Sequence, residues 1–429
     1  MTIDCLHEQS EHIMNKFIAK TLEGDKVVWI IFALLFLISL LEMFSASSRL
    51  VYWSSSVQGP ILRHVIFFAV GFVALLLVQL LSFRAIRHWG YFILFCSWIL
   101  LMYTTLRGIE QAGAARWISI AGFKFQPSEP AKLSLVVVIA DLVERMQNIE
   151  RQNKLFWIVM GGVVFTCAMI FTENFSTAVL LFGIVIIMMF IGEMQWRKIL
   201  TACAGVVGII AIILAMAWFI PDDVYYSSES PVLKKLERSK TWVARIQNFA
   251  NDENVSKYKI NDSNYQANHA QMAIARGGFI PKGPGSSVER NYLPEAFSDF
   301  IFAIIVEELS FFMGIFVMFL YLWLLFRAGR VAQQSDSLFC ALLVIGVTLV
   351  IVLQAFIHIA VSVHLIPVTG QPLPLISRGG TSLLFNCIYF GLIIRVTKHI
   401  QLQKKLKQSV ESTSDSSSVQ TAELVEMAN

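Results

Sequence analysis

The stretch "LFCALLVIGVTLVIVLQAFIHIAVS", residues 338–362, is apolar almost throughout and contains no aspartate, glutamate, lysine or arginine. An apolar run of about 20 residues is long enough to cross the hydrocarbon core of a bilayer, which is about 30 Å thick. This stretch therefore predicts a helix that spans a membrane. Similar runs predict spans at residues 27–44, 62–81, 91–106, 131–144, 155–171, 176–192, 199–220, 300–326, 338–362 and 380–396.

The composition also indicates a membrane protein. The 429 residues are 56% hydrophobic and only 15% charged, whereas a typical soluble domain is about 25% charged. The net charge of +4 gives no reason to expect a nucleic-acid partner. The six cysteines lie in the N-terminal segment or in apolar runs, which predicts neither a disulfide framework nor a zinc site. We expect an all-α polytopic membrane protein of about ten transmembrane helices with one large extracytoplasmic loop.

The order of the apolar runs divides the chain into five segments. Lysine and arginine are more frequent in the short loops on the side of the two termini, which predicts that both termini are cytoplasmic. The tail is rich in serine from Gln408 onward, which favours disorder. The expected segments are 1–26, a cytoplasmic N-terminal segment; 27–220, transmembrane helices 1–7; 221–299, the large extracytoplasmic loop; 300–396, transmembrane helices 8–10; and 397–429, a cytoplasmic, largely disordered tail.

A polar stretch on the expected outer face, "GAARWISIAGFKFQPSEPAKLSL" (113–135), precedes the fourth span. Pro127 is typical of a helix start, and Glu129 and Lys132 are three residues apart on one helical face. One interpretation is a capped helix end with a surface ion pair. The other is an anion site, because Arg116, Lys124 and Lys132 lie beside a helix N-terminus.

The run "EAFSDFIFAIIVEEL" (295–309) carries carboxylates at the edge of the membrane and inside it. Charged groups at membrane depth are costly and by default mark a functional site. If a regular helix begins near Asp299, Glu307 lies about 12 Å deeper at 1.5 Å per residue, and Glu308 points to the far side. Asp299 is therefore the carboxylate that a polar substrate reaches. We interpret Glu307 and Glu308 as structural groups paired with buried polar groups.

Two further segments contain many glycines or prolines. "ARGGFIPKGPGSS" (275–287) permits close approach of backbone to a ligand and adds the cations Arg276 and Lys282. "PVTGQPLPLISRGGTS" (367–382) is not compatible with a plain helix. Irregular backbone beside a span is tolerated where protein buries it or where it lines a wet cavity. A glycine-rich loop by itself is a weak signal, and a simple outer loop is the alternative interpretation of the second segment.

These motifs carry a resemblance to a known family. "FQPSEPAKLS", "LPEAFSDFIFAIIVEEL" and "PVTGQPLPLISRGGTS", in this order, resemble the SEDS (shape, elongation, division, sporulation) peptidoglycan glycosyltransferases over roughly residues 27–400. The sequence around the aspartate is more similar to the cell-division branch, FtsW, than to the rod-elongation branch, RodA. Three positions depart from the family's pattern. Phe297-Ser298 stands where His-Thr is usual, His358 where Asn is common, and Arg378 where Tyr is common.

The resemblance implies an inverting enzyme that polymerises lipid II, an undecaprenyl-pyrophosphate disaccharide-pentapeptide, into glycan strands during cell division. It implies that Asp299 is the catalytic residue, which we interpret as a general base. A divalent metal ion, Mg²⁺ or Mn²⁺, is an expected helper. The candidate substrate-binding residues are Arg116, Gln126, Glu129, Lys132, Gln266, Arg276, Lys282, Glu295, Ser377 and Arg378.

The resemblance also implies partners and a location. The expected partners are a class B penicillin-binding protein, which is a transpeptidase, and other division proteins. The expected place is the bacterial cytoplasmic membrane, at the division septum. Two other functions stay open from the residues alone: a lipid II flippase, and a non-catalytic scaffold of the division machinery. An assay with labelled lipid II separates the three, because only the polymerase makes glycan products.

Overall fold

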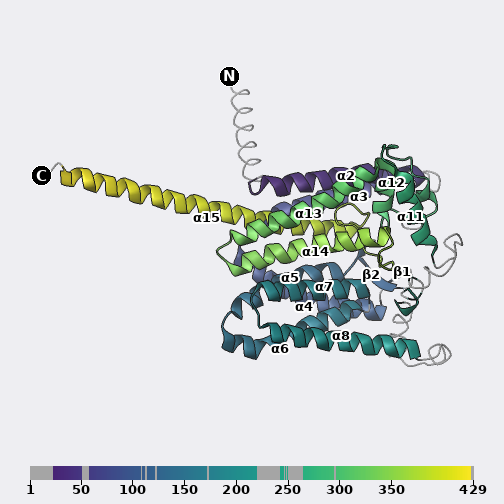
Figure 1. Ribbon diagram of the computed structural model, residues 1–429, viewed down its shortest axis with the longest axis horizontal. Coiled ribbons are helices and arrows are strands. Elements are labelled where there is room, and N and C mark those ends of the chain that lie inside the picture. Colours follow the sequence, from purple (N-terminus) through teal and green to yellow (C-terminus); the bar gives the residue numbers. More distant parts are fainter. Residues whose placement is uncertain are drawn as a thin grey trace, which may run out of the picture.

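The computed structural model describes residues 23–50, 58–107, 109–111, 114–120, 123–171, 173–219, 242–245, 247, 249, 264–293 and 296–426. Long helices in these ranges lie side by side in a bundle (Figure 1). Their bounds are α2 (Lys26–Leu50), α3 (Gln58–Leu80), α4 (Phe83–Arg107), α5 (Ser128–Arg145), α6 (Ile149–Phe171), α7 (Phe175–Ile191), α8 (Trp196–Phe219), α13 (Phe311–Gln333), α14 (Leu338–Ser362) and α15 (Gly380–Glu426).

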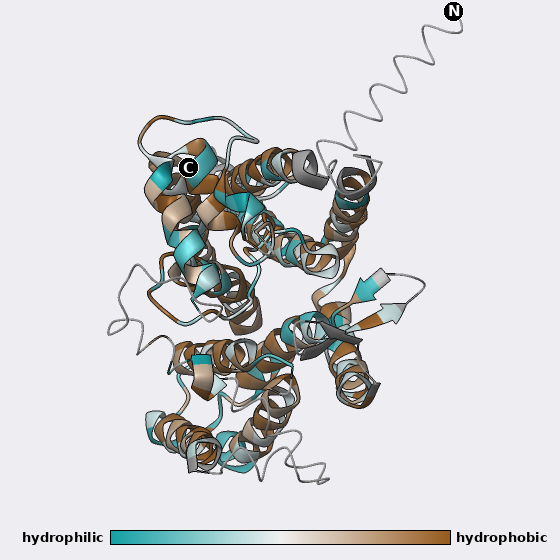
Figure 2. Ribbon diagram, turned by 90° about the vertical axis from the view of Figure 1, so that its right-hand side faces the viewer, coloured by the Kyte–Doolittle hydropathy of each residue, from teal (hydrophilic) through white to brown (hydrophobic). Residues whose placement is uncertain are grey.

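The bundle has the features of a membrane domain. Among the described residues, eight of these helices are long and apolar enough to cross a membrane. The other two, α5 and α7, contain 18 and 17 residues and correspond to the predicted spans 131–144 and 176–192. Large apolar side chains such as Leu37, Phe92 and Ile212 are exposed along the helices. Figure 2 shows the hydrophobic helices end-on. Lipid is the environment in which such a surface is stable.

The start of the first helix, α2, and the end of the last span, in α15, lie on the same side of the bundle. Asp25, just before α2, forms an ion pair with Arg327 near the end of α13. The backbone N–H of Asp25 donates to Thr397 Oγ1 of α15, at 3.2 Å. The start of α2 therefore lies against the segment where α15 leaves the bundle (Figure 1). An even number of crossings requires this arrangement.

The charges of α5 are satisfied inside the protein. Asp141 is fully buried, and its carboxylate pairs with Arg87 of α4 at 2.8 Å and with Arg145 at 2.8 Å. The hydroxyl of Tyr91 donates to Asp141 Oδ2, also at 2.8 Å. A carboxylate at this depth is stable only when it is paired and hydrogen-bonded. These contacts explain how the short predicted span 131–144, which carries Asp141, becomes a central helix.

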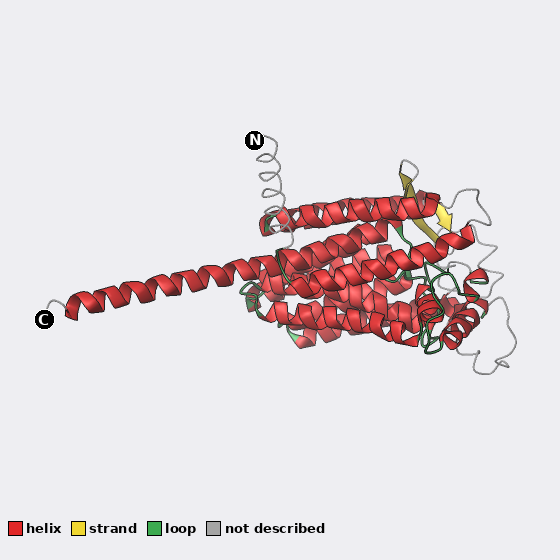
Figure 3. Ribbon diagram, turned by 90° about the horizontal axis from the view of Figure 1, so that it is seen from above, coloured by secondary structure: helices red, strands yellow, loops and turns green. Residues whose placement is uncertain are grey.

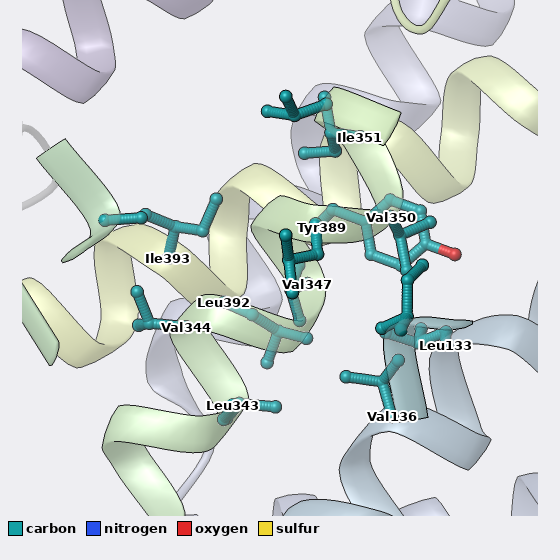
Figure 4. Close-up of a cluster of buried hydrophobic side chains, with 14 of the residues drawn as sticks. Leu133, Val136, Leu343, Val344, Val347, Val350, Ile351, Tyr389, Leu392 and Ile393 are labelled. Atoms are coloured by element: carbon teal, nitrogen blue, oxygen red, sulfur yellow. The ribbon is translucent and has the colours of Figure 1, made fainter. Parts of the chain in front are cut away.

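The core is built around α14. Its buried valines and leucines contact α5 on one side and α15 on another (Figure 4). Gly346 permits this packing, because a Cβ at that position would lie 2.7 Å from Val136 Cγ1 of α5 and 2.6 Å from Met188 Sδ of α7. The labelled members of this cluster are Leu133, Val136, Leu343, Val344, Val347, Val350, Ile351, Tyr389, Leu392 and Ile393.

The predicted span 300–326 is wrong as one continuous helix. The chain forms a nine-residue helix, α12 (Ile301–Leu309), and then starts α13. Ser310 separates them with φ 88°, a left-handed conformation that ends the first helix. The N–H of Ser310 closes α12 on the carbonyl of Val306 at 3.1 Å. A helix of nine residues is too short to span a bilayer, so α13 alone is the eighth span.

Smaller elements gather at the end of the bundle opposite the projecting part of α15 (Figure 3). They are α11 (Tyr265–Gly277), the 3₁₀ helix η1 (Glu289–Asn291), α12 and a small antiparallel sheet. The sheet has the strand order β1 (Ile109–Gln111), β2 (Ala114–Ile120), β3 (Phe123–Phe125). The sequence did not predict these strands. The fold is otherwise all-α, as expected.

The C-terminal segment differs from the expected disorder. α15 continues as a helix to Glu426, although the serine-rich composition from Gln408 favours a disordered tail. No glycine or proline occurs after Gly391, so no residue in the segment breaks the helix begun in the membrane. Side chains of α15 are described as far as Ser409.

Candidate active site

Asp299 lies in the turn directly before α12 and is half-buried. α12 begins at Ile301, so Asp299 precedes the helix rather than opening it. The hydroxyl of Ser298 donates to Asp299 Oδ1 at 3.1 Å. The next residues, from Phe300 to Glu308, are all buried. Among Asp299, Glu307 and Glu308, Asp299 is therefore the carboxylate that lies nearest the surface, as the sequence predicts.

The proline- and glycine-rich segment 366–379 packs directly on this turn. The hydroxyl of Ser377 donates to the carbonyl of Ser298 at 2.8 Å, and the N–H of Arg378 donates to the carbonyl of Phe297 at 2.9 Å. The Ser377 oxygen also accepts from the N–H of Leu373 at 2.6 Å. Ser377 is buried, whereas the side chain of Arg378 is exposed. The segment thus fixes the backbone before Asp299, and its Arg378 side chain is exposed.

Arg245 is a second cation near Asp299, and the sequence did not single it out. Its Nη1 donates to the carbonyl of Val368 at 2.9 Å, and its guanidinium lies 5.3 Å from the ring centroid of Trp242. Burial lowers the pKa of the Arg245 guanidinium, while the negative charge of Asp299 acts to raise it. Because the two charges interact, the long loop brings a cation to the candidate base. A single arginine in a polar loop has no pattern that reveals this.

Lys132 and Glu129 form a buried ion pair rather than a surface pair. Lys132 Nζ lies 2.9 Å from Glu129 Oε1, and the two side chains are only 3% and 4% exposed. Nζ also donates to Gln354 Oε1 of α14 at 3.1 Å. The amide of Gln354 donates to the carbonyl of Pro372 at 2.9 Å. This geometry favours the ion-pair interpretation of Lys132. Through Gln354, the pair is connected to Pro372 of the 366–379 segment.

The cations of the glycine-rich stretch lie at the surface. Arg276 Nη1 pairs with Glu289 Oε1 at 2.6 Å and keeps 45% of its side chain exposed. His269 Nδ1 contacts the other oxygen of Glu289 at 2.6 Å. Lys282 is exposed, and Gln266 is half-buried on α11. The structure thus places Arg276 and Lys282 where a polar ligand reaches them.

Glu307 and Glu308 have hydrogen-bonding partners inside the protein, which agrees with their interpretation as paired groups. Glu307 accepts from the hydroxyl of Ser287 and from the N–H of Val288, the latter at 3.1 Å. Glu308 accepts from the N–H groups of Gly285 and Ser287 at 2.9 and 3.2 Å. Both carboxylates bind one loop because the glycine-rich stretch wraps around the end of α12. The two carboxylates therefore stabilise the conformation of this loop by accepting its hydrogen bonds.

Three further candidate substrate-binding residues are Gln126, Arg116 and Glu295. Gln126 donates to Ser128 Oγ at 3.0 Å at the start of α5 and is half-buried. Arg116 belongs to β2, but its side chain lies outside the described residues, as does all of Glu295. No group of three or more His, Cys, Asp or Glu side chains that could hold a metal ion occurs in the part of the chain that the structure describes.

The comparisons with known proteins identify the family of this chain. A family model described as "Cell cycle protein", which represents FtsW, RodA and SpoVE, matches residues 25–402. A protein of Taylorella equigenitalis named "Probable peptidoglycan glycosyltransferase FtsW" is 31% identical over 344 residues, which cover 78% of this chain and 86% of the relative. "Stage V sporulation protein E" of Bacillus subtilis is 28% identical and covers 89% of this chain and 98% of the relative.

Two solved structures have the same fold. A chain from "Structural coordination of polymerization and crosslinking by a peptidoglycan synthase complex" has a TM-score of 0.64 at 20% identity and covers 88% of this chain and 99% of that chain. The Thermus thermophilus rod shape determining protein RodA has a TM-score of 0.59 at 20% identity and covers 88% and 97%. The present chain, by the extent of these matches, belongs to the FtsW/RodA/SpoVE family of cell cycle proteins.

Proposed function

We propose that this protein is a peptidoglycan glycosyltransferase that polymerises lipid II at the outer face of the cytoplasmic membrane during cell division. The observation that carries the proposal is Asp299, a half-buried carboxylate at the end of a membrane bundle, in a turn that a second segment holds by two hydrogen bonds. Relatives named "Probable peptidoglycan glycosyltransferase FtsW" support the reaction class.

The reaction requires one base and a stabilised leaving group. A sugar hydroxyl of one lipid II molecule attacks the anomeric carbon of another, and the bond from that carbon to the lipid pyrophosphate breaks. The Asp299 carboxylate takes the proton of the attacking hydroxyl, a role worth about 10²–10⁴-fold in rate. The electron pair of the broken bond leaves with the pyrophosphate. A single displacement inverts the anomeric carbon, so no covalent intermediate on the protein is needed.

Cations near Asp299 suit the departing pyrophosphate. Arg245 interacts with the Asp299 charge, and Arg378 is exposed on the segment that holds the turn. Arg276 and Lys282 are further accessible cations on the same end of the bundle. Preorganised cations stabilise charge that develops on a leaving group. We assign Lys132 to the support of this site, because it is buried and already paired.

A divalent ion such as Mg²⁺ or Mn²⁺ remains an expectation. Mg²⁺ is usually held by one or two carboxylates together with substrate phosphates. The lipid pyrophosphate supplies oxygens of this kind, so a metal ion does not need a cluster of protein ligands. When bound, such an ion would supply positive charge at the leaving group.

The proposed orientation places α11, α12 and the sheet outside the cell and both chain termini in the cytoplasm. This follows from the lysine and arginine bias of the loops. We propose that a class B penicillin-binding protein cross-links the new strands and, with other division proteins, works beside this enzyme at the septum. One solved neighbour comes from a peptidoglycan synthase complex described as coordinating polymerization and crosslinking, which supports this type of partner.

The test uses the purified protein with its transpeptidase partner in liposomes that contain labelled lipid II. We expect labelled glycan polymers that a muramidase degrades. Transfer of lipid II across the membrane without polymer would identify a flippase instead. Neither polymer nor transfer, with a partner complex that forms normally, would identify a scaffold.

A further inference from the structure

His358 is fully buried in α14 and makes two hydrogen bonds with its ring. Nδ1 lies 2.8 Å from the carbonyl of Gln371, and Nε2 lies 3.4 Å from the backbone N–H of Phe302. A carbonyl only accepts and an amide N–H only donates. The ring therefore carries its proton on Nδ1, donates there, and accepts at Nε2.

The two partners of His358 belong to the segments on either side of Asp299. Phe302 is the second residue of α12, which begins two residues after Asp299. Gln371 lies in the 366–379 segment, whose Ser377 hydroxyl holds the carbonyl of Ser298. The Gln371 side chain is fixed in turn, because its amide donates to Thr177 Oγ1 of α7 at 2.7 Å. One imidazole thus connects both sides of the turn to the bundle.

The bond to Phe302 replaces a helix cap. The first amides of a helix have no partner inside the helix, and a side chain at the N-cap usually accepts from the second or third residue. The N-cap of α12 is Phe300, whose side chain makes no capping hydrogen bond. His358 supplies the missing acceptor from another helix. The start of α12 is therefore fixed by α14 rather than by its own sequence.

We propose that His358 is a positioning residue for glycosyl transfer: its neutral ring ties the start of α12 to the 366–379 segment and so fixes Asp299 in the geometry of a base. The inference rests on the proposed function. His358 does not touch the reacting atoms, because it is buried beneath the turn. Its loss should therefore affect the rate of the bound complex more than the binding of lipid II.

Three variants test the role in the complex with the transpeptidase partner. His358→Asn keeps a donor and an acceptor, while His358→Leu keeps neither. Thr348→Val is the control, because Thr348 is a buried polar residue of the same helix. We expect His358→Leu to lower kcat about tenfold, the equivalent of one lost buried hydrogen bond, with KM within about twofold. His358→Asn should recover most of kcat, and Thr348→Val should match the parent.

A second measurement does not depend on activity. Hydrogen exchange of peptides covering residues 297–305 should be faster in His358→Leu, near the parental rate in His358→Asn, and unchanged in Thr348→Val. The proposal would be overturned if His358→Leu exchanged hydrogen at the parental rate or kept the parental kcat. It would also be overturned if His358→Asn lost as much kcat and as much thermal stability as His358→Leu. If the parental complex makes no polymer, the proposed function fails, and exchange alone decides whether His358 fixes the turn.

Discussion

The hydroxyl of Ser377 donates a 2.8 Å hydrogen bond to the carbonyl of Ser298, the residue directly before Asp299. The two serines are 79 positions apart in the chain. This bond links the proline-rich segment after α14 to the turn before α12. The backbone of the candidate base is therefore fixed by a part of the protein that lies far from it in the sequence.

Replacement of Ser377 by alanine should disturb this turn. Ser377→Ala leaves the carbonyl of Ser298 and the N–H of Leu373 without their partner, and an unsatisfied buried group costs about 1–3 kcal/mol. We expect a lower thermal midpoint and several-fold slower polymerisation. The control is Ser335→Ala, since Ser335 Oγ donates a similar 3.0 Å bond to the carbonyl of Ser337 in the loop between α13 and α14. Equal activity of both variants would show that the bond to Ser298 is dispensable.

The buried pair of Lys132 and Glu129 gives a test that separates folding from substrate binding. Lys132→Ala should destabilise the protein by about 3–5 kcal/mol, because it leaves the buried Glu129 charge without its partner. Replacing both residues by methionine removes both charges and should recover most of the thermal midpoint, although Gln354 Oε1 loses its donor. We expect the double variant to polymerise lipid II at a rate close to that of the parent. A stable but inactive double variant would instead place the pair in substrate binding.

The sequence predicted the membrane bundle because the physics of a bilayer leaves a strong pattern. Runs such as 338–362 have no other stable environment. The break at Ser310 left no such pattern, because the apolar run continues across it and a serine rarely adopts φ 88°. The small sheet at 109–125 was also missed, since strands of three and seven residues give little periodic signal.

In the candidate site, too, the sequence predicted some residue roles and did not reveal others. Asp299 was predicted because a carboxylate at the edge of an apolar run is costly and therefore conspicuous. Lys132 was interpreted as a ligand cation because the sequence does not reveal its contact with Gln354, which is 222 positions away. The interaction of Arg245 with Asp299 joins two residues that are distant in the sequence. Contacts between distant segments decide the roles of Lys132 and Arg245.

The orientation of the bundle is open to direct measurement. Lys282 lies on the expected outer end, and Lys404 lies on α15 where it leaves the bundle; both are exposed. In a chain whose own cysteines are replaced, Lys282→Cys should react with an impermeant maleimide in intact spheroplasts. Lys404→Cys should react only after lysis. The reverse pattern would invert the protein and remove the site from the face where the proposed substrate is used.

Arg245 should matter for catalysis through its charge. Arg245→Gln removes the cation beside Asp299, and loss of a charged hydrogen bond to a substrate phosphate costs about 1.5–3 kcal/mol. We therefore expect kcat/KM for lipid II to fall at least about tenfold. Arg330→Gln, an exposed arginine near the inner end of α13, is the matched control and should have no effect. If Arg245→Gln kept the parental kcat/KM, the role of Arg245 would be limited to its hydrogen bond with the carbonyl of Val368.

The base role of Asp299 predicts a loss of chemistry without a loss of folding. Asparagine keeps the size of the side chain and still accepts the 3.1 Å hydrogen bond from Ser298, but it cannot take a proton from a sugar hydroxyl. Asp299→Asn should therefore insert and bind the transpeptidase normally, with polymerisation lower by about 10²-fold or more. Asp336→Asn, at an exposed aspartate between α13 and α14, should polymerise like the parent. A folded Asp299→Asn protein with parental polymerisation would refute the mechanism, because no other step assigned to Asp299 explains a carboxylate at this boundary.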